Sequence, residues 1–124
     1  MEFNENRIIC NILMKSLHKK ILWQQTQEIH PVLHKNSEKF ITSCFNTTNL
    51  DDITFYLYTY RALDLDPIFN YHINIDKIEL SLVENNYITW SYSKNGFLIQ
   101  KLLELMTSQM SSIHKFMTLE PCEN

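Results

Sequence analysis

Glycine is almost missing from this sequence, and its scarcity removes one class of site. Gly96 is the only glycine among 124 residues. A loop that wraps backbone N–H groups around a phosphate needs several closely spaced glycines. The chain therefore has no glycine-rich nucleotide loop, and nucleotide binding by that route is excluded.

The sequence also lacks a long apolar run and an excess of positive charge. No stretch approaches the roughly 18 apolar residues that a membrane-spanning helix requires, and the N-terminus does not resemble a signal peptide. Lys and Arg number 11 against 14 Asp and Glu, a net charge of -3. Proteins that bind a phosphate backbone usually carry a dominant basic patch. We therefore expect a soluble, cytoplasmic protein with no nucleic-acid partner and no stable membrane insertion.

The cysteines do not form a disulfide pattern. Cys10, Cys44 and Cys122 are an odd number without paired spacing, which favours free thiols in a reducing compartment. Cys10 and Cys44 lie within apolar patterns and are predicted to be small buried side chains. Cys122 follows Pro121 outside any core pattern, so its thiol is either an accessible nucleophile or part of a frayed C-terminus.

Two helical patterns flank the middle of the chain, whose length fits one domain with one shared core. From residue 5 to about residue 27, apolar side chains recur at three- and four-residue intervals. This spacing predicts an amphipathic helix that ends before Pro31. A second helical pattern begins at Phe97 and ends in the Ser-rich stretch 107–112. We expect the second helix to cap a sheet formed by the residues between.

The residues between the helical patterns are typical of antiparallel strands, because β-branched and aromatic side chains alternate with polar ones. Strands are predicted at residues 32–34, 40–45, 53–63, 68–75, 78–83 and 87–92. The first two should surround a polar loop, and turns are expected at 64–67 and 84–86. An extended tail is expected at 113–119. The predicted order of elements is therefore a helix, an antiparallel meander, a second helix and a tail, which is an α+β fold.

Histidine and tyrosine spacings suggest no site by themselves. His30 and His34 have the spacing of a helical metal pair, but Pro31 interrupts any helix there and no acidic or cysteine partner has fitting spacing. We therefore expect no metal site. Tyr56, Tyr58 and Tyr60 share one face of their predicted strand, and packing within the sheet is the ordinary role of such a stripe.

Two short motifs, taken in chain order, resemble a family of conjugating enzymes. The first runs from Tyr60 through Pro67 and apolar residues to His72, and the second is Glu120-Pro121-Cys122-Glu123-Asn124. Both are similar to motifs of the autophagy-related protein ten family of E2-like enzymes. In that family a strand tyrosine precedes a proline, and the catalytic cysteine lies in a His-Pro-Cys signature. Here Glu120 stands in place of the histidine, and the helical extension that commonly follows the cysteine is missing.

The resemblance implies a ubiquitin-conjugating-enzyme-like fold and acyl transfer through Cys122. The thiol would accept autophagy-related protein twelve from the autophagy activating enzyme, autophagy-related protein seven, and pass it to a lysine of autophagy-related protein five. No cofactor is required for this step. Tyr60 is expected to orient the reacting groups, or else to pack. Glu120 either accepts a proton from the lysine or remains an ordinary solvated carboxylate.

The resemblance also implies direct recognition of the target protein. The predicted strand 68–75 is expected to dock that target by strand addition at or near a sheet edge. Its polar face carries Asn70, His72 and Asn74. These three residues are the expected partner-binding residues.

Two alternatives stay open beside the conjugating enzyme. The first is a non-catalytic helix-sheet-helix adaptor in which Cys122 is incidental and the sheet binds a partner. The second is a small double-stranded-RNA-binding module. Charge argues against it, because the second helix has Lys101 and Glu104 but no basic cluster at its start, where phosphates would bind.

Overall fold

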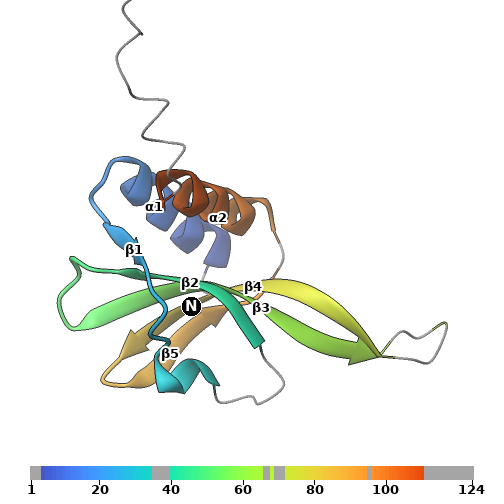
Figure 1. Cartoon of the computed structure of the whole chain (residues 1–124). Helices are drawn as coiled ribbons and strands as arrows, with labels where there is room; N and C mark the ends of the chain where they lie inside the picture. The colour runs from blue at the N-terminus through green and yellow to red at the C-terminus, as the bar shows by residue number, and fades with distance from the viewer. Residues whose placement is uncertain (1–3, 35–39, 66–67, 69–71, 95, 111–124) are drawn as a thin grey trace, which may run out of the picture.

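Two α-helices and a five-stranded antiparallel sheet make up the described part of the chain. The computed structural model describes residues 4–34, 40–65, 68, 72–94 and 96–110. The elements are α1 (Glu5–Leu17), β1 (Trp23–Gln25), the 3-10 helix η1 (Pro31–His34), β2 (Phe40–Thr47), β3 (Ile53–Leu65), β4 (His72–Glu84), β5 (Tyr87–Tyr92) and α2 (Phe97–Met110). The strands follow one another across the sheet in chain order (Figure 1). The predicted α+β class and antiparallel meander are confirmed, and the tail at 113–119 lies outside the described residues.

The helix α1 ends at Leu17, so the prediction that it continues to about residue 27 is wrong. Lys19 has a φ of 58°, in the left-handed region. Its N–H donates to the carbonyl of Ser16 at 3.1 Å, and the N–H of Lys20 donates to the carbonyl of Lys15 at 2.8 Å. This pair of bonds is a Schellman motif, which satisfies the last helical carbonyls and reverses the chain.

A side chain from another turn holds the segment that follows α1. Asn49, between β2 and β3, accepts a hydrogen bond from the N–H of Leu22 and donates one to the carbonyl of Lys20, both at 2.8 Å. These bonds draw residues 20–22 away from the helix axis and toward the sheet. Trp23 can then begin β1 opposite Thr47 of β2.

The strands β3 and β4 form one long hairpin. They pair throughout, from Ile53 opposite Glu84 to Leu65 opposite His72. The prediction of two separate strands at 68–75 and 78–83 is therefore wrong, because residues 76–77 continue the ladder and no glycine or proline interrupts it. Ile68 lies in a turn and is 82% exposed.

The turn between β4 and β5 is confirmed. Asn85 and Asn86 have φ angles of 51° and 68°. Two consecutive residues of positive φ suit a two-residue hairpin, and asparagine tolerates that conformation better than other non-glycine residues. Strand β5 begins immediately after it, opposite Glu84.

Residues 32–34, predicted as a strand, belong to the 3-10 helix η1 and lie outside the five-stranded sheet. Pro31 starts this short helix, and the N–H of Leu33 donates to the carbonyl of His30 at 3.0 Å. The expected hairpin between 32–34 and 40–45 is also wrong, because the neighbours of β2 are β1 and β3. Proline lacks the N–H that a sheet ladder needs but fits the first turn of a helix.

Apolar clusters form on both faces of the sheet. Helices α1 and α2 cover one face, as expected for α2, and η1 lies on the opposite side (Figure 1). The helix-side cluster contains Ile9, Ile12, Ile21, Trp23, Phe45, Leu57, Leu80, Tyr92, Ile99, Leu102 and Met106. The cluster under η1 contains Val32, Leu33, Cys44, Tyr58, Tyr60 and Val83.

One of the two described cysteines is buried as predicted. Cys44 is 1% exposed and packs in the cluster under η1. Cys10 is exposed, so the prediction for it is wrong. In α1 the buried positions are Ile9, Ile12 and Ser16. Cys10 lies one residue, and so about 100° around the helix, from the buried Ile9.

Candidate functional site

Tyr60, the described member of the expected catalytic set, is a buried residue of β3. Its side chain is 6% exposed and belongs to the cluster under η1. The ring centroid lies 5.9 Å from that of Tyr58. Tyr56, Tyr58 and Tyr60 do share one face, because all three belong to or pack against this cluster, so the predicted packing stripe is confirmed.

The remaining expected catalytic residues are not placed by the structure. Cys122 and Glu120 lie outside the described residues, as does Asn70. The proximity of the Cys122 thiol to the Tyr60 hydroxyl therefore stays a prediction.

His72 and Asn74 lie at the start of β4, at the end of the long hairpin where β3 finishes and β4 begins. In the ladder they lie opposite Leu65 and Leu63 of β3. Strand β5 pairs with β4 only from Leu80 to Glu84. Within the described residues, no strand pairs with 72–78 on the side of β5. Unpaired backbone N–H and C=O groups along this edge are what strand addition by a partner requires.

The Cys44 thiol has the wrong environment for a nucleophile. Burial raises its pKa to about 11, so the thiol remains protonated near neutral pH. Burial also raises the pKa of Tyr56, and a nearby Cys44 thiolate adds to that rise. A reactive cysteine needs the opposite, a lowered pKa and solvent access.

His30 has a structural role in joining η1 to the turn between β4 and β5. Its Nδ1 atom accepts a hydrogen bond from the N–H of Val32 at 3.1 Å, so this nitrogen carries no proton. The proton is then on Nε2, which donates to Oδ1 of Asn86 at 3.2 Å. Both ring nitrogens are occupied by these bonds. Within the described ranges, no three His, Cys, Asp or Glu side chains are grouped to hold a metal ion.

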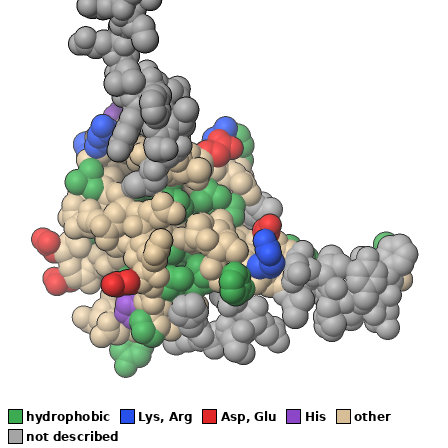
Figure 2. All heavy atoms as spheres, viewed as in Figure 1, with side chains coloured by type: hydrophobic (Ala, Val, Ile, Leu, Met, Phe, Trp, Pro, Cys, Tyr) green, Lys and Arg blue, Asp and Glu red, His purple; other side chains and the backbone are tan. Residues whose placement is uncertain are grey.

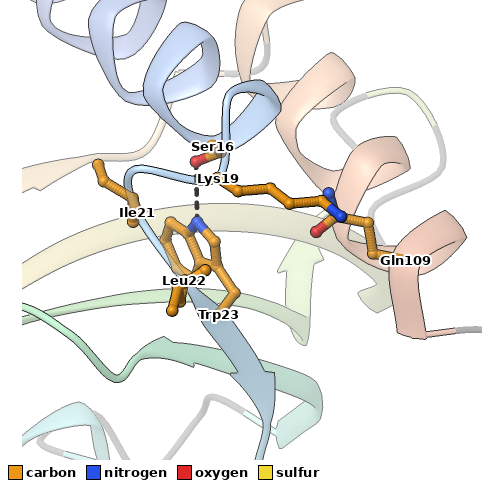
Figure 3. Close-up of a pocket in the computed structure, with 6 residues that line it drawn as sticks. All are labelled: Ser16, Lys19, Ile21, Leu22, Trp23 and Gln109. Carbon is orange, nitrogen blue, oxygen red and sulfur yellow. Dashed lines mark hydrogen bonds between the residues drawn. The ribbon is translucent and has the colours of Figure 1, made fainter.

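An open cavity of about 350 Å³ lies where both α-helices end, and sequence reasoning did not find it. It is lined by Ser16, Lys19, Ile21, Leu22, Trp23 and Gln109, drawn in Figure 3. The Trp23 indole N–H donates to Oγ of Ser16 at 2.8 Å, and this hydroxyl donates to the carbonyl of Ile12 at 2.7 Å. A serine among the apolar positions of α1 was the one signal in the sequence that a buried polar partner exists nearby.

The two α-helices run in the same direction, which explains why their ends meet at this cavity. Near their beginnings, Lys94 and Glu5 form an ion pair at 3.5 Å. Near their ends, Lys19 and Gln109 line the same cavity. Neither helix in the described part of the chain has the length and apolar character needed to cross a membrane.

Comparison with known proteins gives no relative. No family model, no curated protein and no solved structure matches this chain.

Proposed function

We propose that this chain is an E2-like conjugating enzyme, similar to the autophagy-related protein ten family, with a ubiquitin-conjugating-enzyme-like fold. The supporting observation is the order and layering of its elements. A helix precedes an antiparallel meander, a second helix follows it, and both helices cover the same face (Figure 1). Tyr60 lies on the central strand β3, and the motif with Pro121 and Cys122 follows α2.

In the proposed first step, Cys122 takes over an activated acyl group. Its thiolate attacks the thioester carbonyl between autophagy-related protein twelve and the cysteine of the activating enzyme, autophagy-related protein seven. A new carbon–sulfur bond forms, and the thiolate of the activating enzyme leaves. One thioester replaces another at similar energy, so the acyl group stays activated without a nucleotide or metal at this step.

In the second step, a lysine amine of autophagy-related protein five attacks the Cys122 thioester. An amide bond forms, and the Cys122 thiolate leaves. The proton lost by the amine passes to Glu120 or to water. Holding the amine and the thioester together supplies most of the expected acceleration, because the reaction becomes effectively intramolecular.

Strand β3 and the edge of β4 have separate roles in this reaction. Tyr60 on β3 orients the reacting groups through its phenolic hydroxyl. The target protein adds a strand along residues 72–78, where no strand of the described sheet pairs with β4 on the side of β5. His72 and Asn74 belong to this edge, and Asn70 precedes it in the sequence.

The thioester step is tested by substitution of Cys122. With the activating enzyme, ATP and the ubiquitin-like protein, the wild type should give an adduct that a thiol reductant removes. Cys122→Ser should give an adduct that resists the reductant or none, and Cys122→Ala should give none. Cys10→Ala is the matched control, because Cys10 is an exposed thiol on α1. Equal loading of wild type and Cys122→Ala, read by non-reducing gel electrophoresis, would overturn the assignment.

The role of Tyr60 is tested by Tyr60→Phe, which removes only the hydroxyl. We expect transfer from the loaded enzyme to slow about tenfold or more, which corresponds to about 1.4 kcal/mol of barrier. The melting temperature should change little. Tyr87→Phe is the control, because Tyr87 is 68% exposed at the start of β5. If Tyr60→Phe lowers the melting temperature and leaves the transfer rate unchanged, Tyr60 contributes to packing in the sheet and does not orient the reacting groups.

A second candidate function is a non-catalytic protein-interaction adaptor. The observation that favours it is the burial of Tyr60 among the side chains under η1. Packing in this cluster is a sufficient structural role for Tyr60, and it requires no part in catalysis. An adaptor would bind its partner along the β4 edge with equal affinity in wild type and Cys122→Ala. An enzyme would lose transfer in the same variant.

A further inference from the structure

The outward side of α1 carries apolar side chains that no described element covers. Cys10, Met14 and Leu17 lie at positions i, i+4 and i+7, so they form one stripe along the helix. Met14 is 47% and Leu17 50% exposed, and Cys10 is exposed as well. Leu22, just after the helix, is 46% exposed. We call Cys10, Met14, Leu17 and Leu22 the α1 stripe.

Positive charge surrounds the α1 stripe. Every charged residue from 6 to 22 is basic, namely Arg7, Lys15, Lys19 and Lys20, and His18 lies among them. All five are exposed, and within the described ranges none of them forms an ion pair. Figure 2 shows Lys or Arg and His side chains gathered at the end of α1. This local concentration contrasts with the net charge of -3 for the whole chain.

The cavity at the helix ends continues this surface. Leu22 of the α1 stripe and Lys19 of its basic border both line it (Figure 3). Its volume of about 350 Å³ has room for one large apolar side chain beside Trp23. Protein interfaces concentrate their binding energy in such anchor pockets, with a polar rim around them.

We propose that the α1 stripe and the adjoining cavity bind an acidic, amphipathic helical segment of another protein, with one aromatic or leucine side chain in the cavity. The apolar i, i+4, i+7 spacing of the stripe suits a second helix packed along α1. The cations around the stripe match carboxylates on that helix, and this complementary charge accelerates association and selects against basic partners. A concave anchor pocket favours a protein over an anionic membrane, whose surface is flat. This proposal does not depend on the conjugating activity.

The test is selection of peptides from a displayed random library of 16-residue segments on the intact protein. We expect enrichment of peptides that are rich in Asp and Glu and carry apolar residues at helical spacing. Peptides enriched on the wild type should bind at least tenfold more weakly to Met14→Gln/Leu17→Gln and to Lys19→Glu/Lys20→Glu. The matched controls Phe40→Gln and Arg61→Glu change an exposed apolar side chain and an exposed basic side chain that belong neither to the α1 stripe nor to the cavity. Circular dichroism confirms that each variant is folded.

Several outcomes would overturn the proposal. One is that no peptide is enriched, and another is that the enriched peptides are neutral or basic. Equal binding of the enriched peptides to wild type and both double variants would place them elsewhere on the chain. A membrane would be the partner instead if no peptide is enriched and the wild type sediments with phosphatidylserine vesicles while both double variants do not. None of these outcomes affects the thioester assay of Cys122.

Discussion

At the scale of single residues, burial decides which of the described thiols can react. Cys10 and Cys44 both lie in apolar sequence patterns, yet one is exposed on α1 and the other is 1% exposed in the sheet. Loss of water around Cys44 disfavours its thiolate and raises its pKa to about 11. The surroundings of a cysteine therefore decide its reactivity, and sequence pattern alone did not separate these two residues.

We predict that iodoacetamide modifies Cys10 and spares Cys44 in the folded protein at about pH 8. Peptide mass spectrometry after a short exposure measures both, and modification of Cys44 should appear only after denaturation. Equal labelling of the two thiols in the native protein would contradict the buried position of Cys44.

The raised pKa of Cys44 also predicts a direction for stability against pH. The folded state holds the thiol proton more tightly than the unfolded state, whose pKa is near 9.0. The stabilising contribution is therefore complete below about pH 9 and is lost as pH rises through about 11. Urea unfolding across this range should show a steeper loss for the wild type than for Cys44→Ala. Tyr56, whose pKa is also raised, contributes in the same direction in both proteins.

At the scale of elements, boundaries depend on caps and partners more than on apolar spacing. Ile21 and Leu22 continue the apolar periodicity of α1, yet the helix ends at Leu17. The Schellman motif at Lys19 and the two hydrogen bonds of Asn49 outweigh that periodicity. In contrast, the Asn85-Asn86 turn was predictable, because its residues have an intrinsic preference for the conformation it needs.

Lys19→Gly should stabilise the protein, because glycine adopts the φ of 58° without the steric penalty of a side chain. We expect a gain of about 0.5 to 1 kcal/mol in the free energy of unfolding. Lys19→Val, a β-branched residue at the same position, should destabilise by a similar or larger amount. Both are measured by urea denaturation with the wild type. A loss of stability in Lys19→Gly would show that the lysine side chain contributes more than the backbone strain removes.

At the scale of the whole molecule, a single sheet with one core layer on each face holds the described chain together. Leu80 of β4 is fully buried in the helix-side cluster, where side chains from α1, α2 and the sheet meet. Interiors of this kind are close-packed, so a removed side chain leaves a cavity that its neighbours fill only in part. Packing of the helices on the sheet therefore depends on such residues.

Leu80→Ala is expected to lower the free energy of unfolding by about 2 to 5 kcal/mol. The reason is the loss of buried apolar contacts together with the cavity that remains. Phe40→Ala is the control, because Phe40 is 69% exposed at the start of β2 and should change stability by no more than about 0.5 kcal/mol. Equal effects of the two substitutions in urea denaturation would contradict the placement of Leu80 in the core.

The sequence by itself determined the α+β class, the antiparallel order, strands β2, β3 and β5, helix α2 and the shared face of Tyr56, Tyr58 and Tyr60. Side-chain periodicity and turn preference are local properties, so they can be read along the chain. Only the tertiary structure decided the end of α1, the unbroken β4, the helical state of residues 32–34 and the exposure of Cys10. It also brought Ser16, Trp23 and Gln109 to one cavity. These features depend on contacts between residues far apart in sequence, such as Asn49 with Lys20. The local preferences of single residues do not predict such contacts, and the contacts can override those preferences.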